Sequence, residues 1–447
     1  MPEFDPTIFK AYDIRGIYPD QLDDQTGYLI GNALAVYLKP EQVVIGRDMR
    51  LSSEALFDAF TRGVTDAGVD VVDIGLVSTD GLYFAVGKYG YDAGVMITAS
   101  HNPKEYNGFK ICKNEAIPLS GRDGLNLIAD LAAQNDPKIR PERGAVVRRD
   151  ISADYTENCL SYVHSDALRN YKVAFDAGNG MAGLTLPPIL ARINLESIHL
   201  YFELDGTFPN HPASPIEPEN IADLIAKIKE TGADFGVAFD GDADRMFLVD
   251  NQGRALGGDM VMAMVAQKLL ADHPGETILY NAICSRAVPE LISRLGGTPV
   301  RTPVGHALIK PMMREKNAIF GGEHSGHFYF RDNWFADSGM IAFLVCLELL
   351  SKSGKTLSQI ISEIDPYFRS GEINSEVSDQ REVIERISRS YDDGKQDRLD
   401  GLTVEYDNWW FNVRPSNTEP LLRLNVEADT REILKEKTDA LLGLIRG

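Results

Sequence analysis

The sequence has few cysteines and no long apolar run. Its four cysteines, among 447 residues, are scattered and lie mostly in apolar segments, which indicates reduced core thiols and excludes a disulfide framework. The longest apolar run, residues 340–345, is too short to cross a bilayer and is predicted to lie in a core helix. The start of the chain lacks the basic and apolar regions of a signal peptide, so we expect a cytoplasmic protein.

Positive charge is also in short supply. Acidic side chains outnumber basic ones by 66 to 45, which gives a net charge of −21 and argues against nucleic acid or a membrane surface as partner. The hydrophobic fraction of 44% is enough for real cores, and the length predicts about three domains. The composition is typical of a soluble enzyme.

A serine and a histidine stand side by side in the sequence TASHNP at residues 98–103. The apolar residues 94–97 come directly before, and Pro103 and the Asn107-Gly108 pair follow. Ser100 is therefore predicted to lie in a loop at the carboxyl end of a buried strand, where open α/β sheets present their chemistry.

Three carboxylates follow another apolar stretch, in the sequence FDGDADR at residues 239–245. Their spacing of two residues points them the same way in extended backbone, and such a cluster repels itself unless a cation lies within it. Oxygen ligands select Mg²⁺ or Ca²⁺. The EF-hand is excluded, because that loop needs glycine and glutamate where this chain has Arg245 and Asn251.

Two further loops carry polar side chains suited to a small polar ligand. The first, GGEHSGH at residues 321–327, places Glu323 and Ser325 where they can bind neighbouring hydroxyls. His324 and His327 are not expected to form a metal site, because a third soft ligand is lacking nearby. The second, RPSNTEP at residues 414–420, combines a guanidinium, two hydroxyls and an amide, which indicates an anion cradle.

A weak internal repeat predicts how these loops come together. Strand-like residues 43–46, 172–175 and 277–280 each enter a polar loop and a helix, and each unit ends in the strand that delivers Ser100, Asp240 or Glu323. After residue 366 the pattern changes to a helix at 382–390, short strands within 402–426 and an amphipathic helix at 430–445. We therefore predict an α/β fold of three similar units with mixed sheets, at 1–150, 151–252 and 253–366, then a smaller α+β domain at 367–447, with a central catalytic cleft.

With these motifs in order along the whole chain, and FKAYDIRG at residues 9–16, the sequence resembles the α-D-phosphohexomutases, most closely the bacterial phosphomannomutase/phosphoglucomutase branch. The resemblance implies reversible interconversion of hexose 1-phosphates and hexose 6-phosphates through a phosphoserine and a hexose 1,6-bisphosphate, with Mg²⁺ as cofactor and hexose phosphates as the partners of a monomer or weak homodimer. The presence of Ala243 in the sequence Asp-Gly-Asp-Ala-Asp-Arg argues against the phosphoglucosamine mutase branch, which usually has glycine at this position.

The resemblance also assigns roles to residues. Ser100 would carry the phosphoryl group, and a phosphoserine oxygen would complete a Mg²⁺ site made by Asp240, Asp242 and Asp244. The catalytic residues would further include His101, Lys110, Arg15 and Arg245. Lys110 matches the family's proposed general base, which requires a lowered pKa, but it could equally serve only to attract phosphate. The residues that would bind substrate are His306, Glu323, Ser325, His327, Arg414, Ser416, Asn417 and Thr418.

One position departs from the family pattern, and other functions stay open. Close relatives often carry a lysine where this chain has Ile283, and Arg286 is a candidate to replace it. A phosphoglucosamine mutase, a metal-dependent sugar phosphatase and a catalytically silent sugar-phosphate sensor are the alternatives. The intact Ser100, Lys110 and three aspartates argue against the sensor.

Overall fold

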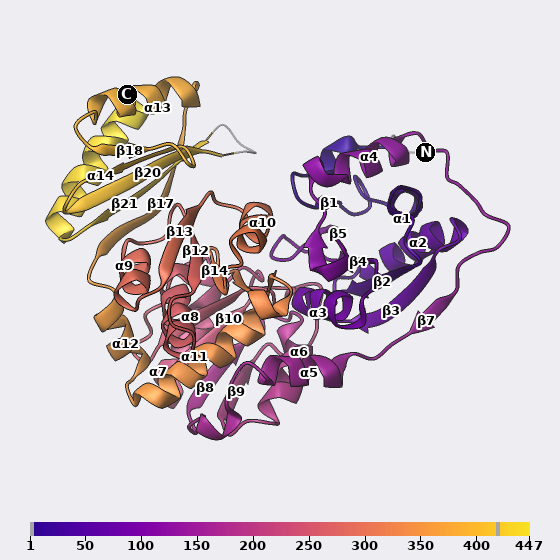
Figure 1. Ribbon diagram of the computed structural model, residues 1–447, viewed down its shortest axis with the longest axis horizontal. Helices are drawn as coiled ribbons and strands as arrows, with labels where there is room; N and C mark the ends of the chain where they lie inside the picture. The colour runs from indigo at the N-terminus through magenta and orange to yellow at the C-terminus, as the bar shows by residue number, and fades with distance from the viewer. Residues whose placement is uncertain (1–3, 417–420) are drawn as a thin grey trace.

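Four β-sheets follow one another along the chain in the computed structural model, which describes residues 4–416 and 421–447 (Figure 1). The first has the strand order β1-β5-β4-β2-β3-β7, with β6 paired to β5. Its strands are β1 (Ile14–Ile17), β2 (Gln42–Arg47), β3 (Asp70–Leu76), β4 (Ala93–Ile97), β5 (Tyr106–Lys113), β6 (Ile117–Pro118) and β7 (Val146–Arg148). Its helices are α1 (Asp24–Leu38), α2 (Ser53–Asp66), α3 (Thr79–Tyr89) and α4 (Leu125–Ala133).

The second and third sheets belong to two further α/β units. The second is ordered β11-β10-β8-β9 and the third β13-β12-β14-β15-β16. The second unit contains α5 (Ser152–Leu160), β8 (Lys172–Asp176), α6 (Ala182–Leu190), β9 (Glu196–Leu200), α7 (Ala222–Thr231), β10 (Phe235–Phe239) and β11 (Met246–Asp250). The third contains α8 (Gly258–Asp272), β12 (Thr277–Asn281), α9 (Ala287–Arg294), β13 (Thr298–Thr302), α10 (His306–Lys316), β14 (Phe320–Gly322), β15 (Phe328–Phe330), β16 (Ala336–Asp337), α11 (Gly339–Ser353) and α12 (Leu357–Ile364).

The C-terminal domain is an antiparallel sheet with two helices, ordered β17-β21-β20-β19-β18. It has a hydrophobic core of its own. In Figure 1 it lies beyond the third unit, on the opposite side of the molecule from the first. Its elements are β17 (Phe368–Glu376), α13 (Gln380–Ser390), β18 (Lys395–Asp397), β19 (Leu402–Glu405), β20 (Trp409–Pro415), β21 (Leu421–Ala428) and α14 (Arg431–Arg446).

The predicted fold class and the predicted repeat are confirmed by the strand orders. The orders β3-β2-β4-β5, β9-β8-β10-β11 and β13-β12-β14-β15 are the same arrangement three times, with three parallel strands and a last antiparallel one. The third strand of each unit, β4, β10 or β14, runs into the loop that carries Ser100, Asp240 or Glu323. Because parallel strands open their loops at their carboxyl ends, each unit contributes one loop from an equivalent edge.

Burial of both faces of the first sheet joins the first unit to the next two. Along β2, Val43 and Ile45 pack against α1, α2 and α4, whereas Val44 faces the core that contains α3. That second core continues into the other two units, where the rings of Phe175 and Phe343 lie 5.3 Å apart. Continuous apolar strands of this kind are typical of sheets that are covered on both sides.

Two expectations from composition also hold. All four cysteines are free and buried, and burial raises the pKa of Cys112 to about 12. Residues 340–345 lie in the buried helix α11. None of the helices in residues 4–416 and 421–447 combines the length and apolar composition that crossing a bilayer requires.

Candidate active site

Ser100 occupies the loop between β4 and β5 in a left-handed backbone conformation, with φ of 52°. Such a conformation costs a residue other than glycine about 1–3 kcal/mol and persists only where the surroundings hold it. Two contacts do so: the Ser100 amide donates to Thr98 Oγ1 at 2.9 Å, and Arg50 Nη2 donates to the Ser100 carbonyl at 2.9 Å. Strain of this kind is a frequent property of functional loops.

Arg50 was not singled out by the sequence analysis, yet it shapes the whole serine loop. It is only 2% exposed, and it donates to the carbonyl oxygens of Ser100, Asn102, Pro103 and Tyr106. Its Nε lies 3.3 Å from Asp48 Oδ2. The only signal in the sequence was its place in the polar loop that follows β2.

The three aspartates converge next to Ser100. The Ser100 hydroxyl donates to Asp240 Oδ2 at 2.8 Å, and one oxygen from each of Asp240, Asp242 and Asp244 lies within 4.8 Å of the others. All three side chains are buried, and burial together with the two neighbouring charges raises the pKa of Asp240 well above its usual range. Within the described residues, the Oδ1 atoms of Asp242 and Asp244 accept no hydrogen bond. A hard divalent cation would satisfy these oxygens and remove the repulsion, so the residues present fit a metal ion.

Lys110 reaches the same carboxylates from β5. Its Nζ lies 2.7 Å from Asp242 Oδ2 and 2.6 Å from Asp244 Oδ2. Burial by itself would lower the pKa of Lys110, but the two carboxylates outweigh it and the pKa is raised. A general base needs a lowered pKa. In this arrangement Lys110 is therefore a protonated partner of the loop that carries Asp240, Asp242 and Asp244, which we call the acidic loop.

His101 lies beside the serine hydroxyl. Its Nδ1 lies 3.2 Å from Ser100 Oγ. The positive charge of Arg245, then burial and Arg15, hold the pKa of His101 well below its usual value. A neutral imidazole can accept a hydrogen bond through one ring nitrogen and donate one through the other.

The two predicted catalytic arginines contact different parts of this centre. Arg15 Nε donates to Asp13 Oδ2 at 2.7 Å, and its Nη1 donates to the side chain of Asn102 in the serine loop. Arg245 Nε lies 3.6 Å from Asp240 Oδ2. Arg15 therefore combines an ion pair with a direct contact to the serine loop.

The loop after β14 holds Glu323 in a fixed orientation. Glu323 is 2% exposed, and its carboxylate accepts from the Gly305 amide at 2.9 Å and from the Tyr329 hydroxyl at 2.7 Å. Ser325 is half-buried in the same loop. The backbone of His306 begins α10, and its side chain lies outside the described part of the structure.

His327 connects this loop to the acidic loop. Its Nδ1 lies 2.8 Å from Asp337 Oδ2 and 3.9 Å from Asp244 Oδ1, and its backbone pairs with that of Arg245. Asp337 is also paired with the buried Lys310, at 2.6 Å. His324 has a different neighbour, Asp259, at 3.5 Å, so the two histidines do not face one site.

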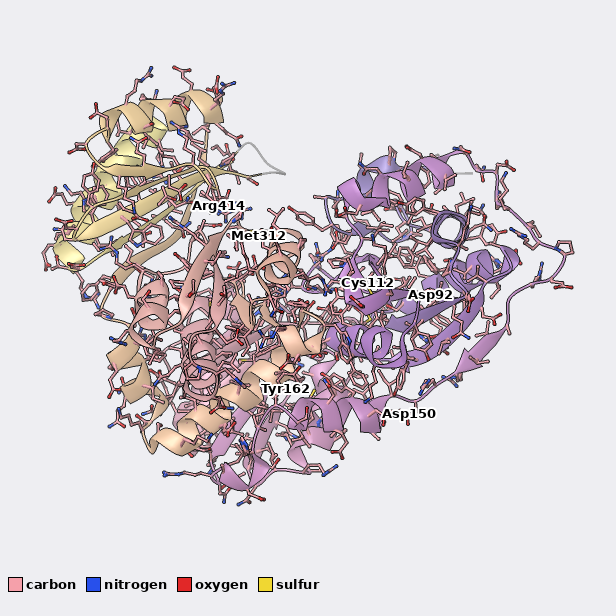
Figure 2. All side chains as sticks on the ribbon, viewed as in Figure 1. Asp92, Cys112, Asp150, Tyr162, Met312 and Arg414 are labelled. Carbon is pink, nitrogen blue, oxygen red and sulfur yellow. The ribbon has the colours of Figure 1, made fainter. Side chains whose placement is uncertain are left out.

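The predicted anion cradle lies on the C-terminal domain, where Figure 2 shows Arg414 at the end of the sheet that is turned toward the other units. Arg414 Nη2 donates to Glu372 Oε2 at 2.8 Å, and Arg423 Nη1 lies 3.3 Å from Glu372 Oε1. The Ser416 amide donates to the Leu421 carbonyl at 2.8 Å. Asn417 and Thr418 lie outside the described residues.

Arg286, the candidate to replace the lysine expected at the position of Ile283, contacts the C-terminal domain. Its Nη1 and Nη2 donate to the carbonyl oxygens of Asp407 and Tyr406, at 3.0 and 3.1 Å. Arg286 therefore joins the third unit to the C-terminal domain.

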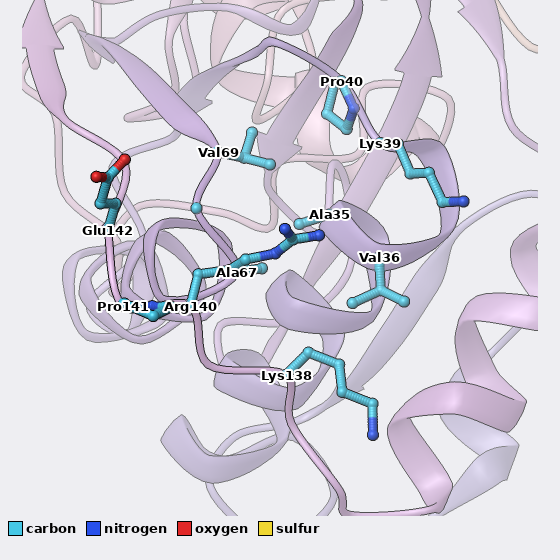
Figure 3. Close-up of a pocket in the computed structure, with 11 residues that line it drawn as sticks. Ala35, Val36, Lys39, Pro40, Ala67, Val69, Lys138, Arg140, Pro141 and Glu142 are labelled. Carbon is cyan, nitrogen blue, oxygen red and sulfur yellow. The ribbon is translucent and has the colours of Figure 1, made fainter.

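A hollow of about 650 Å³ lies elsewhere, on the outer side of the first unit (Figure 3). Its charged lining residues are Lys39, Lys138, Arg140 and Glu142. Among the residues that the structure describes, none from the four sequence motifs lines it. The candidate site is therefore defined by the convergence of side chains from three sheets.

Family models match nearly the whole chain. They are described as phosphoglucomutase/phosphomannomutase alpha/beta/alpha domain I at residues 6–138, domain II at 153–253, domain III at 257–367 and the C-terminal domain at 372–443.

Individual relatives agree over the full length. The chain is 40% identical to a phosphomannomutase of Salmonella typhimurium over 450 residues, covering 98% of this chain and 99% of that one. It is 40% identical to a protein of Xanthomonas campestris pv. campestris named phosphohexose mutases, over 443 residues, with 98% and 99% covered. The crystal structure of a phosphoglucomutase/phosphomannomutase family protein from Burkholderia thailandensis superposes with a TM-score of 0.91 at 32% identity, covering 99% of this chain and 98% of that one.

Proposed function

Because the chain belongs to the phosphoglucomutase/phosphomannomutase family, we propose that it interconverts hexose 1-phosphates and hexose 6-phosphates, with Ser100 as the carrier of the transferred phosphoryl group. The observation that supports this role most directly is the position of the Ser100 hydroxyl, 2.8 Å from an aspartate of the buried acidic cluster. A nucleophile beside a cation-binding cluster and several fixed positive charges is the arrangement that phosphoryl transfer requires.

The first half of the reaction would break the bond between phosphorus and Ser100 Oγ. The phosphoryl group would pass to a hydroxyl of a hexose monophosphate. The oxygen of that hydroxyl forms the new bond, and its proton ends on the released Ser100 Oγ. Arg15, Arg245 and Lys110 would supply positive charge around the transferred group. His101, neutral and 3.2 Å from Oγ, is placed to orient the serine or share in proton transfer.

Asp240, Asp242 and Asp244 would hold Mg²⁺, together with an oxygen of the phosphoserine. A bound Mg²⁺ neutralises negative charge on a transferring phosphoryl group. The chain's own contribution is to keep the three carboxylates buried and directed at one point.

The second half would return the other phosphate to Ser100 after the hexose 1,6-bisphosphate has turned around. Glu323 and Ser325 would bind sugar hydroxyls, with His306 and His327 as further substrate contacts from the same unit. The cradle of Arg414, Ser416, Asn417 and Thr418 would hold the phosphate that is not reacting.

The physiological setting follows from the same proposal. Hexose phosphates would be the partners, in the cytoplasm, of a monomer or weak homodimer that does not act on nucleic acid or membranes. The alternative substrate is glucosamine phosphate. The alternative reaction is hydrolysis by a metal-dependent phosphatase, which has less use for a second phosphate site.

The deciding experiment is incubation with mannose 1-phosphate, Mg²⁺ and a trace of hexose 1,6-bisphosphate. We expect mannose 6-phosphate to accumulate in the amount of substrate consumed, and Ser100→Ala to give none. Stoichiometric release of inorganic phosphate would instead identify a phosphatase. Faster turnover of glucosamine 1-phosphate in a parallel reaction would favour the other branch.

A further inference from the structure

Asp80 lies where the three α/β units meet, outside all four sequence motifs. It is 1% exposed, and its carboxylate accepts one hydroxyl from each unit. Ser78 donates from the first unit, Tyr155 of α5 donates at 2.7 Å from the second, and Ser338 donates at 2.6 Å from the third. One side chain therefore connects all three units.

The residue before Asp80 binds the acidic loop directly. The Thr79 amide donates to the Asp242 carbonyl at 3.0 Å, and the Thr79 hydroxyl donates to Asp242 Oδ2 at 2.5 Å. Thr79 and Asp80 are the first two residues of α3. A rotation of this helical turn would therefore move the carboxylate of Asp242.

A second connection leads from Asp80 to the loop after β14, which contains Glu323 and His327. Ser338 also accepts from the Ile341 amide at 3.1 Å, which makes it the N-cap of α11. The residue before it is Asp337, which lies 2.8 Å from His327. The carboxylate of Asp80 thus stands between the residues that hold Asp242 and the residues that hold His327.

A buried carboxylate at this junction costs free energy, because its charge is removed from water. Burial raises the pKa of Asp80 to about 6 although the three hydroxyls oppose the shift, so the group is mainly ionised at pH 7.5. Within the described residues, no lysine or arginine forms an ion pair with it. Close packing alone would be served better by a neutral side chain, whereas a charged acceptor binds and orients several hydroxyls at once.

We propose that Asp80 is a positioning residue, which holds the first turn of α3 so that Asp242 of the second unit and His327 of the third stay aligned with Ser100. The inference rests on the proposed function for its effect on turnover. Its effect on the acidic loop is independent of that function.

The test compares Asp80→Asn with Thr156→Val. The first keeps the size of the side chain and removes its charge. The second removes a buried hydroxyl from the same helix as Tyr155, one that donates to the Ser152 carbonyl and does not contact Asp80. For Asp80→Asn we expect kcat to fall about tenfold with a smaller change in KM, and the Mg²⁺ concentration for half-maximal rate to rise severalfold. Thr156→Val is expected to change neither.

A binding measurement separates this inference from the proposed function. The Mg²⁺ dependence of the melting temperature reports the acidic loop without any turnover, and Asp80→Asn is expected to shift it to higher Mg²⁺. If Mg²⁺ raises the melting temperature of the wild type but the protein converts no hexose phosphate, the proposed function fails. The comparison of the Mg²⁺ dependence between the wild type and Asp80→Asn still decides the inference.

A lowered melting temperature with unchanged kcat and unchanged Mg²⁺ dependence would overturn the inference and leave Asp80 a purely structural residue. Tyr155→Phe removes a single hydroxyl, so it gives the same test in a milder form if Asp80→Asn does not fold. Combining Asp80→Asn with Thr79→Val is expected to cost less than the sum of the two changes, because both act on Asp242.

Discussion

The centre around Ser100 and the cradle on the C-terminal domain are held in very different ways. At the centre, buried side chains of different units bind one another directly, as Ser100 binds Asp240 and Lys110 binds Asp242 and Asp244. The C-terminal domain has its own core and meets the third unit through polar contacts, such as the Val304 amide donating to Asp400 at 2.8 Å.

This difference suits a reaction in which one end of the substrate reacts while the other is only held. Phosphoryl transfer depends on positions fixed to fractions of an ångström, whereas the distal phosphate must be released and bound again each time the bisphosphate turns around. Partly exposed ion pairs are worth about 0–1 kcal/mol each, so they can rearrange at little cost. We therefore treat the centre as the fixed part and the C-terminal domain as the adjustable part.

Loss of the fixed part should have the largest effect. For Ser100→Ala we expect kcat to fall by at least about a thousandfold, because the group that carries the phosphoryl is removed. The loss of the hydrogen bond from Ser100 to the buried Asp240 should lower the free energy of unfolding by about 1–3 kcal/mol, so the variant should stay folded. Mass spectrometry of the intact protein should find a phosphoryl adduct on the wild type and none on the variant. Turnover near the wild-type rate in Ser100→Ala would end the phosphoserine hypothesis.

The choice between sugars tests the role of the loop that carries Glu323. During the half-turn O3 and O4 roughly exchange places before Glu323, whose carboxylate is already oriented by Gly305 and Tyr329. Glucose and mannose share both hydroxyls, whereas galactose has an axial O4. We predict similar use of glucose and mannose 1-phosphates, and a value of kcat/KM about tenfold to a hundredfold lower for galactose 1-phosphate.

Glu323→Gln should reduce the difference in kcat/KM between mannose and galactose 1-phosphates, because it weakens the hydrogen bond to O4. The matched variant Tyr329→Phe, which keeps the carboxylate but removes one of its two donors, should narrow it less. Equal kcat/KM for galactose and mannose 1-phosphates in the wild type would show that this loop does not read O4.

A smaller effect is expected in the adjustable part, from the pairing of Arg414 with Glu372. Glu372 competes with a substrate phosphate for this guanidinium, so Glu372→Gln should lower KM about twofold to fivefold with kcat unchanged, within the range of one partly exposed ion pair. Glu385→Gln breaks an ion pair with Arg398 in the same domain and serves as the control. A raised KM in Glu372→Gln would mean that Glu372 orients Arg414 and does not compete with the ligand.

The smallest expected effect is a decrease in the overall dimensions of the molecule when ligand binds. A substrate that bridges Ser100 and the cradle should draw the C-terminal domain inward about the Asp365-Pro366 segment, shielding the intermediate from water. In this structure Asp365 accepts from Arg254 at 2.8 Å and from Arg369 at 2.7 Å, which places the pivot beside charged contacts that can re-form. Small-angle scattering of Ser100→Ala with saturating hexose bisphosphate should show compaction, and identical profiles with and without ligand would contradict closure.

The loops of the site could be predicted from the sequence because local patterns define them. Short apolar runs predicted β4, β10 and β14, and the polar loops that follow carry Ser100, Asp240 and Glu323. The helices at 382–390 and 430–445 are confirmed as α13 and α14, since their amphipathic repeat is also local.

Residues that act across long separations escaped prediction. Thr79 meets Asp242 across 163 positions, and neither Asp80 nor Arg50 belongs to a periodic pattern that would mark it. The pKa of Lys110 is a similar case: its place in the site was expected, but the direction of its shift depends on Asp242 and Asp244 lying within ion-pair distance. Such properties depend on how the three units are placed against one another.

The α/β units contain thiols that can be labelled chemically, whereas the C-terminal domain does not. Cys112, Cys159, Cys284 and Cys346 are all buried in the α/β units, and the C-terminal domain has none. A folded protein should therefore react slowly with alkylating reagents, because the thiolate is the reactive form and burial raises the pKa of each thiol. Labelling would therefore record the opening of the core that contains all four thiols, which runs through the three α/β units and is separate from the core of the C-terminal domain.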